Sequence, residues 1–76
     1  MTTTVFLLEI TADDGSDCKI GVFSTLQRAL DEIPAAFRLG EGEPAGDFEM
    51  ERSFITEYEI DGDEVAFYNG YGKQVS

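Results

Sequence analysis

The N-terminal part of the chain carries apolar residues on both sides of a strand-like segment. Five of the eight residues from Thr4 to Thr11 are large and apolar, and a β-prone run without polar alternation is typical of an interior strand. Residues 13–17 are Asp, Gly and Ser, which favour a turn before a second predicted strand at Cys18 to Phe23. The two strands predict a hairpin whose facing aliphatic pairs are Ile10 with Ile20 and Leu8 with Val22.

A helix is predicted directly after this hairpin. Ser24 can accept hydrogen bonds from the first free amides of a helix, and Gln27, three residues later, can complete a capping box. Four apolar residues then recur at helical spacing, which predicts an amphipathic helix that covers the sheet: Leu26, Ala29, Leu30 and Ile33. Pro34 either ends or kinks this helix or begins a further turn that runs to Leu39.

The C-terminal part predicts a second hairpin after a polar loop. Residues 40–47 have the composition of an exposed, mobile loop, and order is expected to resume near Phe48. Strands are predicted from Ser53 to Ile60 and from Glu64 to Asn69, joined by a two-residue loop at Gly62 and Asp63. Pairing Asp61 with Glu64 then collects three facing apolar pairs on one side: Ile60 with Val65, Tyr58 with Phe67, and Phe54 with Tyr71.

Together these elements predict an α+β fold in a single domain of residues 1–76. It consists of a four-stranded antiparallel sheet in ββαββ order with one helix packed on one face. One helix cannot cover both faces, so the other face is expected to hold a mixed apolar and acidic set: Val5, Leu7, Phe23, Ile55, Glu57, Glu59 and Tyr68. Either this face binds a partner or a second copy of the chain, or the segment from Pro34 to Phe48 folds back over it.

The charge of the chain limits its binding partners. Sixteen acidic residues stand against five basic ones, which gives a formal net charge of -11 over 76 residues. Nucleic acids are bound through Lys and Arg, and an anionic membrane repels such a chain, so neither is expected as a direct partner. Ten of the acids lie between Glu41 and Glu64 beside the single base Arg52, which makes a net charge of -9 in that segment, whereas six acids and three bases in residues 1–40 make -3.

The cellular compartment is also constrained by the sequence. Cys18 is the single cysteine, which excludes an intramolecular disulfide and fits a reducing environment. The first four residues lack the basic region of a signal peptide, and the apolar run from Val5 to Leu8 is too short for a membrane span. A cytoplasmic location is therefore expected.

The sequence contains few of the residue types and spacings that catalysis or metal binding requires. The chain has no histidine, so the usual general base at neutral pH is missing, and neither Ser24 nor Ser53 has a recognisable activating partner. The acidic turns at residues 13–17 and 61–64 lack the spacing of a calcium-binding EF-hand loop. We therefore expect no enzyme activity, no catalytic residues, no metal site and no cofactor.

The order of elements resembles that of small bacterial and phage domains of unknown function. The resemblance rests on the segment from Val5 to Ile33, in which Gly21-Val22-Phe23-Ser24 leads into a helix that carries Ala29, and on the later motif Phe54-Ile55-x-x-Tyr58-x-Ile60-Asp61. These domains are built as hairpin, helix and hairpin. The resemblance implies a fold and no activity.

Two explanations for the acidity remain. In the first, the chain is a non-catalytic inhibitor that occludes a basic, nucleic-acid-binding surface of a partner protein, in the manner of phage-encoded anti-CRISPR proteins. The residues predicted to bind the partner are Glu49, Glu51, Ile55, Glu57, Glu59, Tyr68 and Phe23. In the second, the chain is a halophilic or self-associating structural domain, such as a homodimer, and its acids only maintain hydration.

Overall fold

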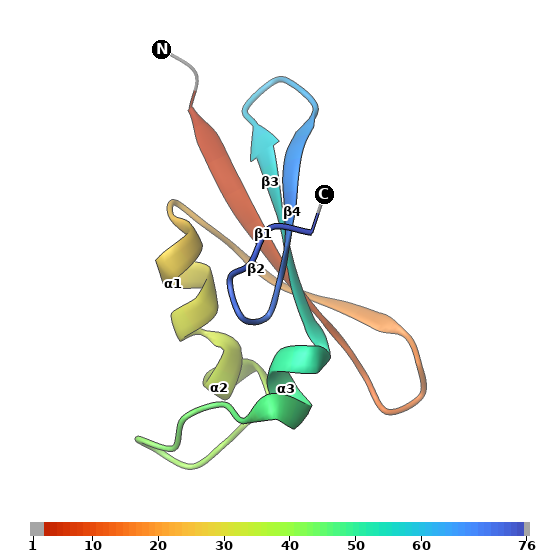
Figure 1. The fold of residues 1–76 in the computed structure, drawn as a ribbon, viewed down its shortest axis with the longest axis vertical. Coiled ribbons are helices and arrows are strands. Elements are labelled where there is room, and N and C mark those ends of the chain that lie inside the picture. Colours follow the sequence, from red (N-terminus) through yellow and green to blue (C-terminus); the bar gives the residue numbers. More distant parts are fainter. Residues whose placement is uncertain (1–2, 76) are drawn as a thin grey trace.

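The computed structural model describes residues 3–75 and contains one four-stranded antiparallel sheet with strand order β2-β1-β3-β4 (Figure 1). Three short helices pack on one side of this sheet. In chain order the elements are β1 (Thr4–Thr11), β2 (Asp17–Phe23), α1 (Leu26–Asp31), α2 (Ile33–Ala36), α3 (Asp47–Glu51), β3 (Ser53–Glu59) and β4 (Glu64–Asn69).

The α+β class and the antiparallel sheet are confirmed. Strands β1 and β4 have the predicted bounds, whereas β2 begins one residue earlier than predicted and β3 ends one residue earlier. The central strands β1 and β3 pair with each other and bring Leu8 opposite Ile55. These two side chains and Ala29 and Ile33 from the helices are almost completely buried and form the core of the fold.

The first hairpin has a different register from the predicted one. Leu8 faces Gly21 and Ile10 faces Cys18, because a β-bulge between Leu8 and Glu9 shifts the pairing along β2. A bulge adds one residue to one strand and so changes which side chains share a face. As a result Phe23 lies beside Phe6 and packs against the core instead of facing outward.

The second hairpin also differs, and its two faces are exchanged relative to the prediction. Tyr58 pairs with Glu64 and Ile55 pairs with Tyr68, with a bulge between Glu57 and Tyr58. The connection is longer than two residues, since the amide of Glu59 donates to the carbonyl of Asp63 at 3.1 Å. Asp61 has a φ of 62° in this loop, a left-handed conformation that Asp tolerates better than most residues.

Three short helices replace the single predicted helix. The N-cap of α1 is Thr25 and not Ser24, because the Thr25 hydroxyl accepts a hydrogen bond from the amide of Arg28 at 3.1 Å. Pro34 stands in the first turn of α2, where its missing N–H costs nothing. The proline therefore begins a further helical turn, which was one of the two predicted alternatives, although α2 ends at Ala36.

The loop after α2 returns along the helix side of the sheet. Phe37 and Ala45 pack against the core cluster, so the segment from Pro34 to Phe48 does not fold back over the opposite face. Gly40 and Glu43 close a turn in this loop through the 2.9 Å hydrogen bond from the Glu43 amide to the Gly40 carbonyl. The predicted mobility of residues 40–47 stays a prediction.

The chain after β4 turns back and contacts α3. Gly70 is buried and lies so close to Met50 that a β-carbon at this position would collide with the Met50 carbonyl. The hydroxyl of Tyr71 donates a 2.9 Å hydrogen bond to the carboxylate of Asp47 on α3. These contacts fix the C-terminal turn against the helix that precedes β3.

Candidate functional site

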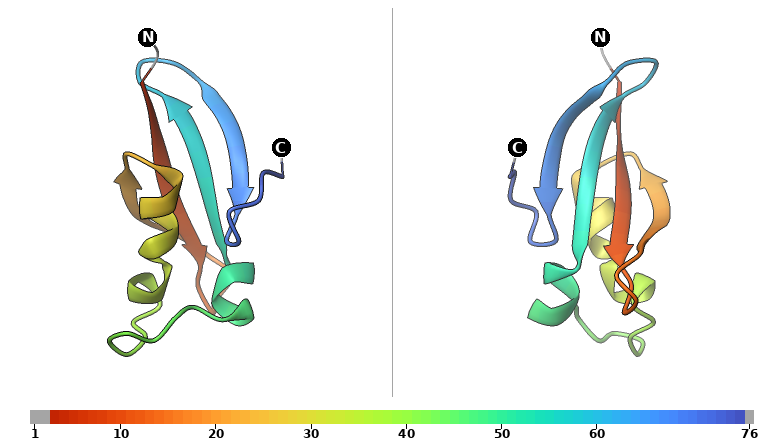
Figure 2. Two further views of the ribbon diagram at one scale, coloured as in Figure 1. Left: turned by 60° about the vertical axis from the view of Figure 1, so that its left-hand side comes forward. Right: turned by 90° about the vertical axis from the view of Figure 1, so that its right-hand side faces the viewer.

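The face of the sheet opposite the helices is not covered by any element in residues 3–75. The right-hand view of Figure 2 looks onto this face, with α1 and α2 behind the strands. The strand registers place six large apolar or aromatic residues on it, which we call the open face: Val5, Leu7, Val22, Phe54, Tyr58 and Phe67. Continuous apolar surface of this kind is typical of interaction sites.

Contacts between neighbouring strands hold the open face together. The rings of Phe54 and Phe67 lie 5.6 Å apart, within the range of favourable aromatic pairing. Thr56 lies between Leu7 and Phe67 across the strands and is buried to 4% exposure, although no helix covers it. The larger side chains around Thr56 therefore form a packed surface and not a set of isolated exposed residues.

Four carboxylates stand around the β3–β4 turn, at one end of the sheet. We call this group the acidic tip; it consists of Glu59, Asp61, Asp63 and Glu64, all exposed. Glu64 pairs with Tyr58 and so shares a face with the apolar residues, whereas Glu59 follows Tyr58 and alternates to the helix side at the end of β3. A further acid, Glu9, lies across from Phe54 and from Lys19 on the same face. The open face thus combines apolar surface with a net negative border.

Of the six other acids of the segment 41–64, Glu57 lies within β3 and five lie at the other end of the molecule. The acidic tip stands at the top of Figure 1, and α3 and the loop before it stand at the bottom, along an axis of 38 Å. The second group consists of Glu41, Glu43, Asp47, Glu49 and Glu51. These acids are close in the sequence but form no continuous stripe, because β3 lies between the two groups.

The structure divides the seven predicted partner-binding residues among four places. Two of them, Phe23 and Ile55, pack in or against the core, and Ile55 has no exposed surface. Glu59 belongs to the exposed acidic tip. Glu49 and Glu51 lie on α3 at the far end, where the Glu49 carboxylate accepts a 3.0 Å hydrogen bond from the Gly46 amide.

The last two predicted residues, Glu57 and Tyr68, bind each other on the helix side of the sheet. The Tyr68 hydroxyl donates a 2.8 Å hydrogen bond to Glu57 Oε1, and the ring of Tyr68 lies 6.3 Å from that of Phe6. This hydrogen bond, supported by partial burial and the negative charge of Glu57, raises the pKa of Tyr68 above its ordinary value of 10.0. Glu57 therefore has a structural role that the sequence did not indicate.

The Tyr68–Glu57 pair predicts a specific response to alkaline pH. Only the neutral phenol can donate, so the pair stabilises the fold below the ordinary tyrosine pKa of 10.0, and the stabilisation is lost as the pH rises through the raised pKa of Tyr68. Because the pKa of Tyr71 is raised as well, the tyrosinate titration at 295 nm is done in a Tyr71→Phe background, where Glu57→Gln should lower the apparent pKa of Tyr68 and Tyr68→Phe should remove that step. Glu59→Gln is the control and should leave the step in place; an unchanged step in Glu57→Gln would contradict the assignment.

Sequence reasoning missed Phe54, Tyr58 and Phe67 as surface residues. It placed them on the helix-covered side because the assumed two-residue turn fixed the wrong register. No local signal in the sequence corrects this register, because it depends on the pairing of β1 with β3, which places Leu8 opposite Ile55 and joins distant segments.

Neither a metal-ligating cluster nor a membrane-spanning helix is present in the part of the chain that the structure describes. No group of three or more His, Cys, Asp or Glu side chains is placed to hold a metal ion. Within residues 3–75, no helix has the length and apolar character needed to cross a membrane. Comparisons with protein-family models, with curated proteins and with solved structures find no match for this chain.

Proposed function

We propose that this chain is a non-catalytic binding protein that recognises a basic surface of a partner protein and thereby keeps nucleic acid from that surface. The observation that carries the proposal is the open face itself: packed aromatic and aliphatic side chains with the acidic tip at one end. Apolar contacts at the centre of an interface slow dissociation, while charges at its border speed association and select the partner.

The net charge of -11 supports the choice of a basic partner. A surface that binds phosphates presents Lys and Arg, and carboxylates at the acidic tip can occupy the same positions. Phage-encoded inhibitors of nucleases act in this way as a class, and this similarity of chemistry is an analogy. The proposed contact keeps Glu59 from the sequence-based set and replaces the buried members with Phe54, Tyr58 and Phe67.

A capture experiment with charge-matched variants tests the proposal. The immobilised chain is exposed to lysate from its native cell, or from a cell that it enters, beside Glu59→Lys/Glu64→Lys and the control Glu41→Lys/Glu43→Lys. Both variants change the charge equally, but at opposite ends of the molecule. We expect a partner that the wild type and the control retain and the tip variant loses, with release near ~0.5 M salt because exposed charges are then screened.

The captured protein is then purified and bound to a labelled oligonucleotide, and the chain is added. Displacement of the oligonucleotide is the expected result. Val22→Ser should weaken displacement, whereas Phe48→Ser on α3 should not, although the two side chains are 59% and 55% exposed. If no retained protein depends on the tip, or if the oligonucleotide stays bound, the proposal is wrong. Melting that depends on chain concentration would indicate a homodimer instead.

A further inference from the structure

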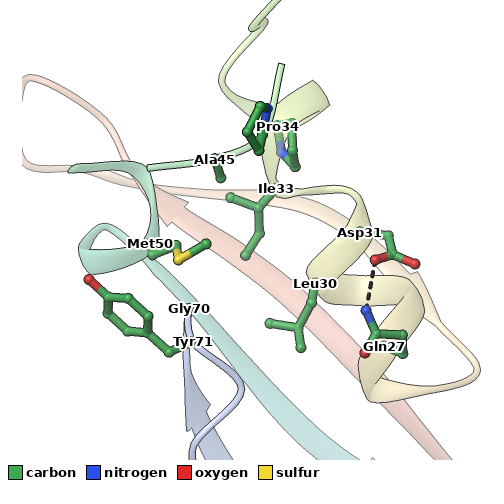
Figure 3. Close-up of a pocket in the computed structure, with 10 residues that line it drawn as sticks. Gln27, Leu30, Asp31, Ile33, Pro34, Ala45, Met50, Gly70 and Tyr71 are labelled. Carbon is green, nitrogen blue, oxygen red and sulfur yellow. Dashed lines mark hydrogen bonds between the residues drawn. The ribbon is translucent and has the colours of Figure 1, made fainter. Parts of the chain in front are cut away.

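A groove with a volume of about 350 Å³ lies on the helix side of the molecule, away from the open face. One wall comes from α1 and α2, and the other from α3 and the turn after β4 (Figure 3). Its surface is formed largely by apolar groups: Leu30, Ile33, Pro34, Ala45, Met50 and the ring of Tyr71. The volume lies at the lower end of the range for ligand sites, enough for one or two large side chains.

The walls of the groove are fixed by contacts that do not depend on a ligand. Gly70 packs on the Met50 carbonyl, and Tyr71 is bound to Asp47, so the C-terminal turn is attached to α3. On the opposite wall the side-chain amide of Gln27 donates a 2.8 Å hydrogen bond to Asp31. A cavity that exists before binding loses little conformational entropy when it is filled.

Within residues 3–75, the one charged residue that lines the groove is acidic, and a second acid contacts the lining residue Tyr71. Asp31 belongs to one wall, and Asp47 holds Tyr71 on the other. The hydrogen bond to Asp47, followed by partial desolvation and the negative charges of Asp47 and Glu51, raises the pKa of Tyr71. None of the ten described residues that line the groove is Lys or Arg. An anionic ligand would therefore be repelled, and a cationic one attracted.

We propose that this groove binds a short peptide segment in which one or two large apolar side chains are flanked by Lys or Arg. The apolar side chains fill the space between Leu30, Ile33 and Met50, and the flanking cations lie near Asp31 and Asp47. The occupant is a segment of a partner protein, since the groove is open at its rim and can admit an extended chain. This site is separate from the open face, and its existence does not depend on the proposed function.

A synthetic peptide tests the groove directly. The probe is a capped Lys-Arg-Leu-Leu-Arg-Lys peptide, and its binding is followed by changes in the amide spectrum of the ¹⁵N-labelled chain. We expect saturable shifts in α1, α2 and α3 and around Tyr71. A peptide with both leucines replaced by serine, and one with all cations replaced by glutamate, should each bind at least ~tenfold more weakly, because one lacks the apolar contact and the other the charge attraction.

Two charge-reversal variants distinguish binding at the groove from attraction of the cationic peptide by the net negative charge of the whole chain. Asp31→Lys should weaken binding of the probe by roughly tenfold, whereas Asp63→Lys at the acidic tip, with the same change in net charge, should change it less than about twofold. Thermal unfolding is measured first, so that only folded variants are compared. The proposal would be overturned if Asp31→Lys and Asp63→Lys weakened binding of the probe equally, or if the spectral shifts were confined to the open face. It would also be overturned if the glutamate peptide bound, or if no saturable binding was observed.

Discussion

Ile55→Ala should lower the free energy of unfolding by about 3–4 kcal/mol. Ile55 has no exposed surface, and its side chain lies between Leu8 and the helix residues Ala29 and Ile33. Truncation leaves a cavity that the two central strands cannot close, and such substitutions cost roughly 2–5 kcal/mol. A chain of this length is stable by only about 4–11 kcal/mol, so the midpoint of thermal unfolding should fall by roughly 12–25 °C.

The matched control is Ile60→Ala, which deletes the same atoms at a residue that is 54% exposed. Its cost should stay below about 1 kcal/mol, because most of the side chain is already in water. Circular dichroism during thermal and urea unfolding measures both variants. The comparison also decides between the two registers of the second hairpin, since the sequence-based pairing places Ile60 among the covered residues and Ile55 outside. If Ile55→Ala and Ile60→Ala lowered the free energy of unfolding equally, the observed core would be contradicted.

Gly70→Ala should destabilise the fold by about 2–3 kcal/mol or more. The added β-carbon would meet the carbonyl oxygen and carbon of Met50, which are backbone atoms and cannot rotate away. Insertion of one methyl group into a packed site usually costs about 1–3 kcal/mol, and a backbone collision belongs at the upper end. Either α3 or the C-terminal turn must move, so the Tyr71–Asp47 hydrogen bond should also be lost.

Gly46→Ala serves as the control for this substitution. At Gly46 a β-carbon would come no closer than 3.7 Å to the Glu49 carboxylate, an ordinary contact. Alanine reduces the conformational entropy of the unfolded chain, which stabilises the fold, but it is a poorer N-cap residue than glycine, which destabilises α3. Because these two effects nearly cancel, the free energy of unfolding should change by no more than about 0.5 kcal/mol. Urea unfolding measures both free energies. A neutral Gly70→Ala would mean that α3 and the turn after β4 are not in contact.

The class of fold and the existence of all four strands were predictable, but their faces were not. In β3, Phe54 and Tyr58 on one side and Ile55 on the other are all apolar, so alternation does not say which side is covered. Two bulges then shift the pairings, and a bulge has no clear signal in either strand. The pairing of β1 with β3, which joins Leu8 to Ile55, is a contact between distant segments that no local pattern determines.

Helix α3 was missed for a local reason. Its five residues alternate acidic and apolar side chains and follow a Gly- and Pro-rich stretch, which together favour a loop. The signal was present at Gly46, since a glutamate three residues later can bond back to the amide of the cap residue, as Glu49 does here.

The division of the acidic residues could have been anticipated from the predicted strand. A strand of seven residues extends the chain by ~3.3 Å per residue, or roughly 23 Å, so acids before Ser53 and acids after Glu59 must lie far apart. Proximity in the sequence therefore did not mean proximity in space. The candidate contact surface consequently contains one acidic group, at the β3–β4 turn, and not both.

The C-terminal residues after the turn also restrict how copies of this chain can join. Gln74 forms an antiparallel bridge with Tyr68, and the Val75 amide donates to the Phe67 carbonyl at 2.8 Å, so part of the outer side of β4 already has a partner. Strand β2 forms the opposite border of the sheet and has no neighbouring strand beyond it in residues 3–75. Strand addition through backbone hydrogen bonds can thus proceed mainly from one border. A second copy or an extended peptide that adds a strand therefore finds the longer unpaired border at β2, whereas residues 74 and 75 occupy part of the border at β4.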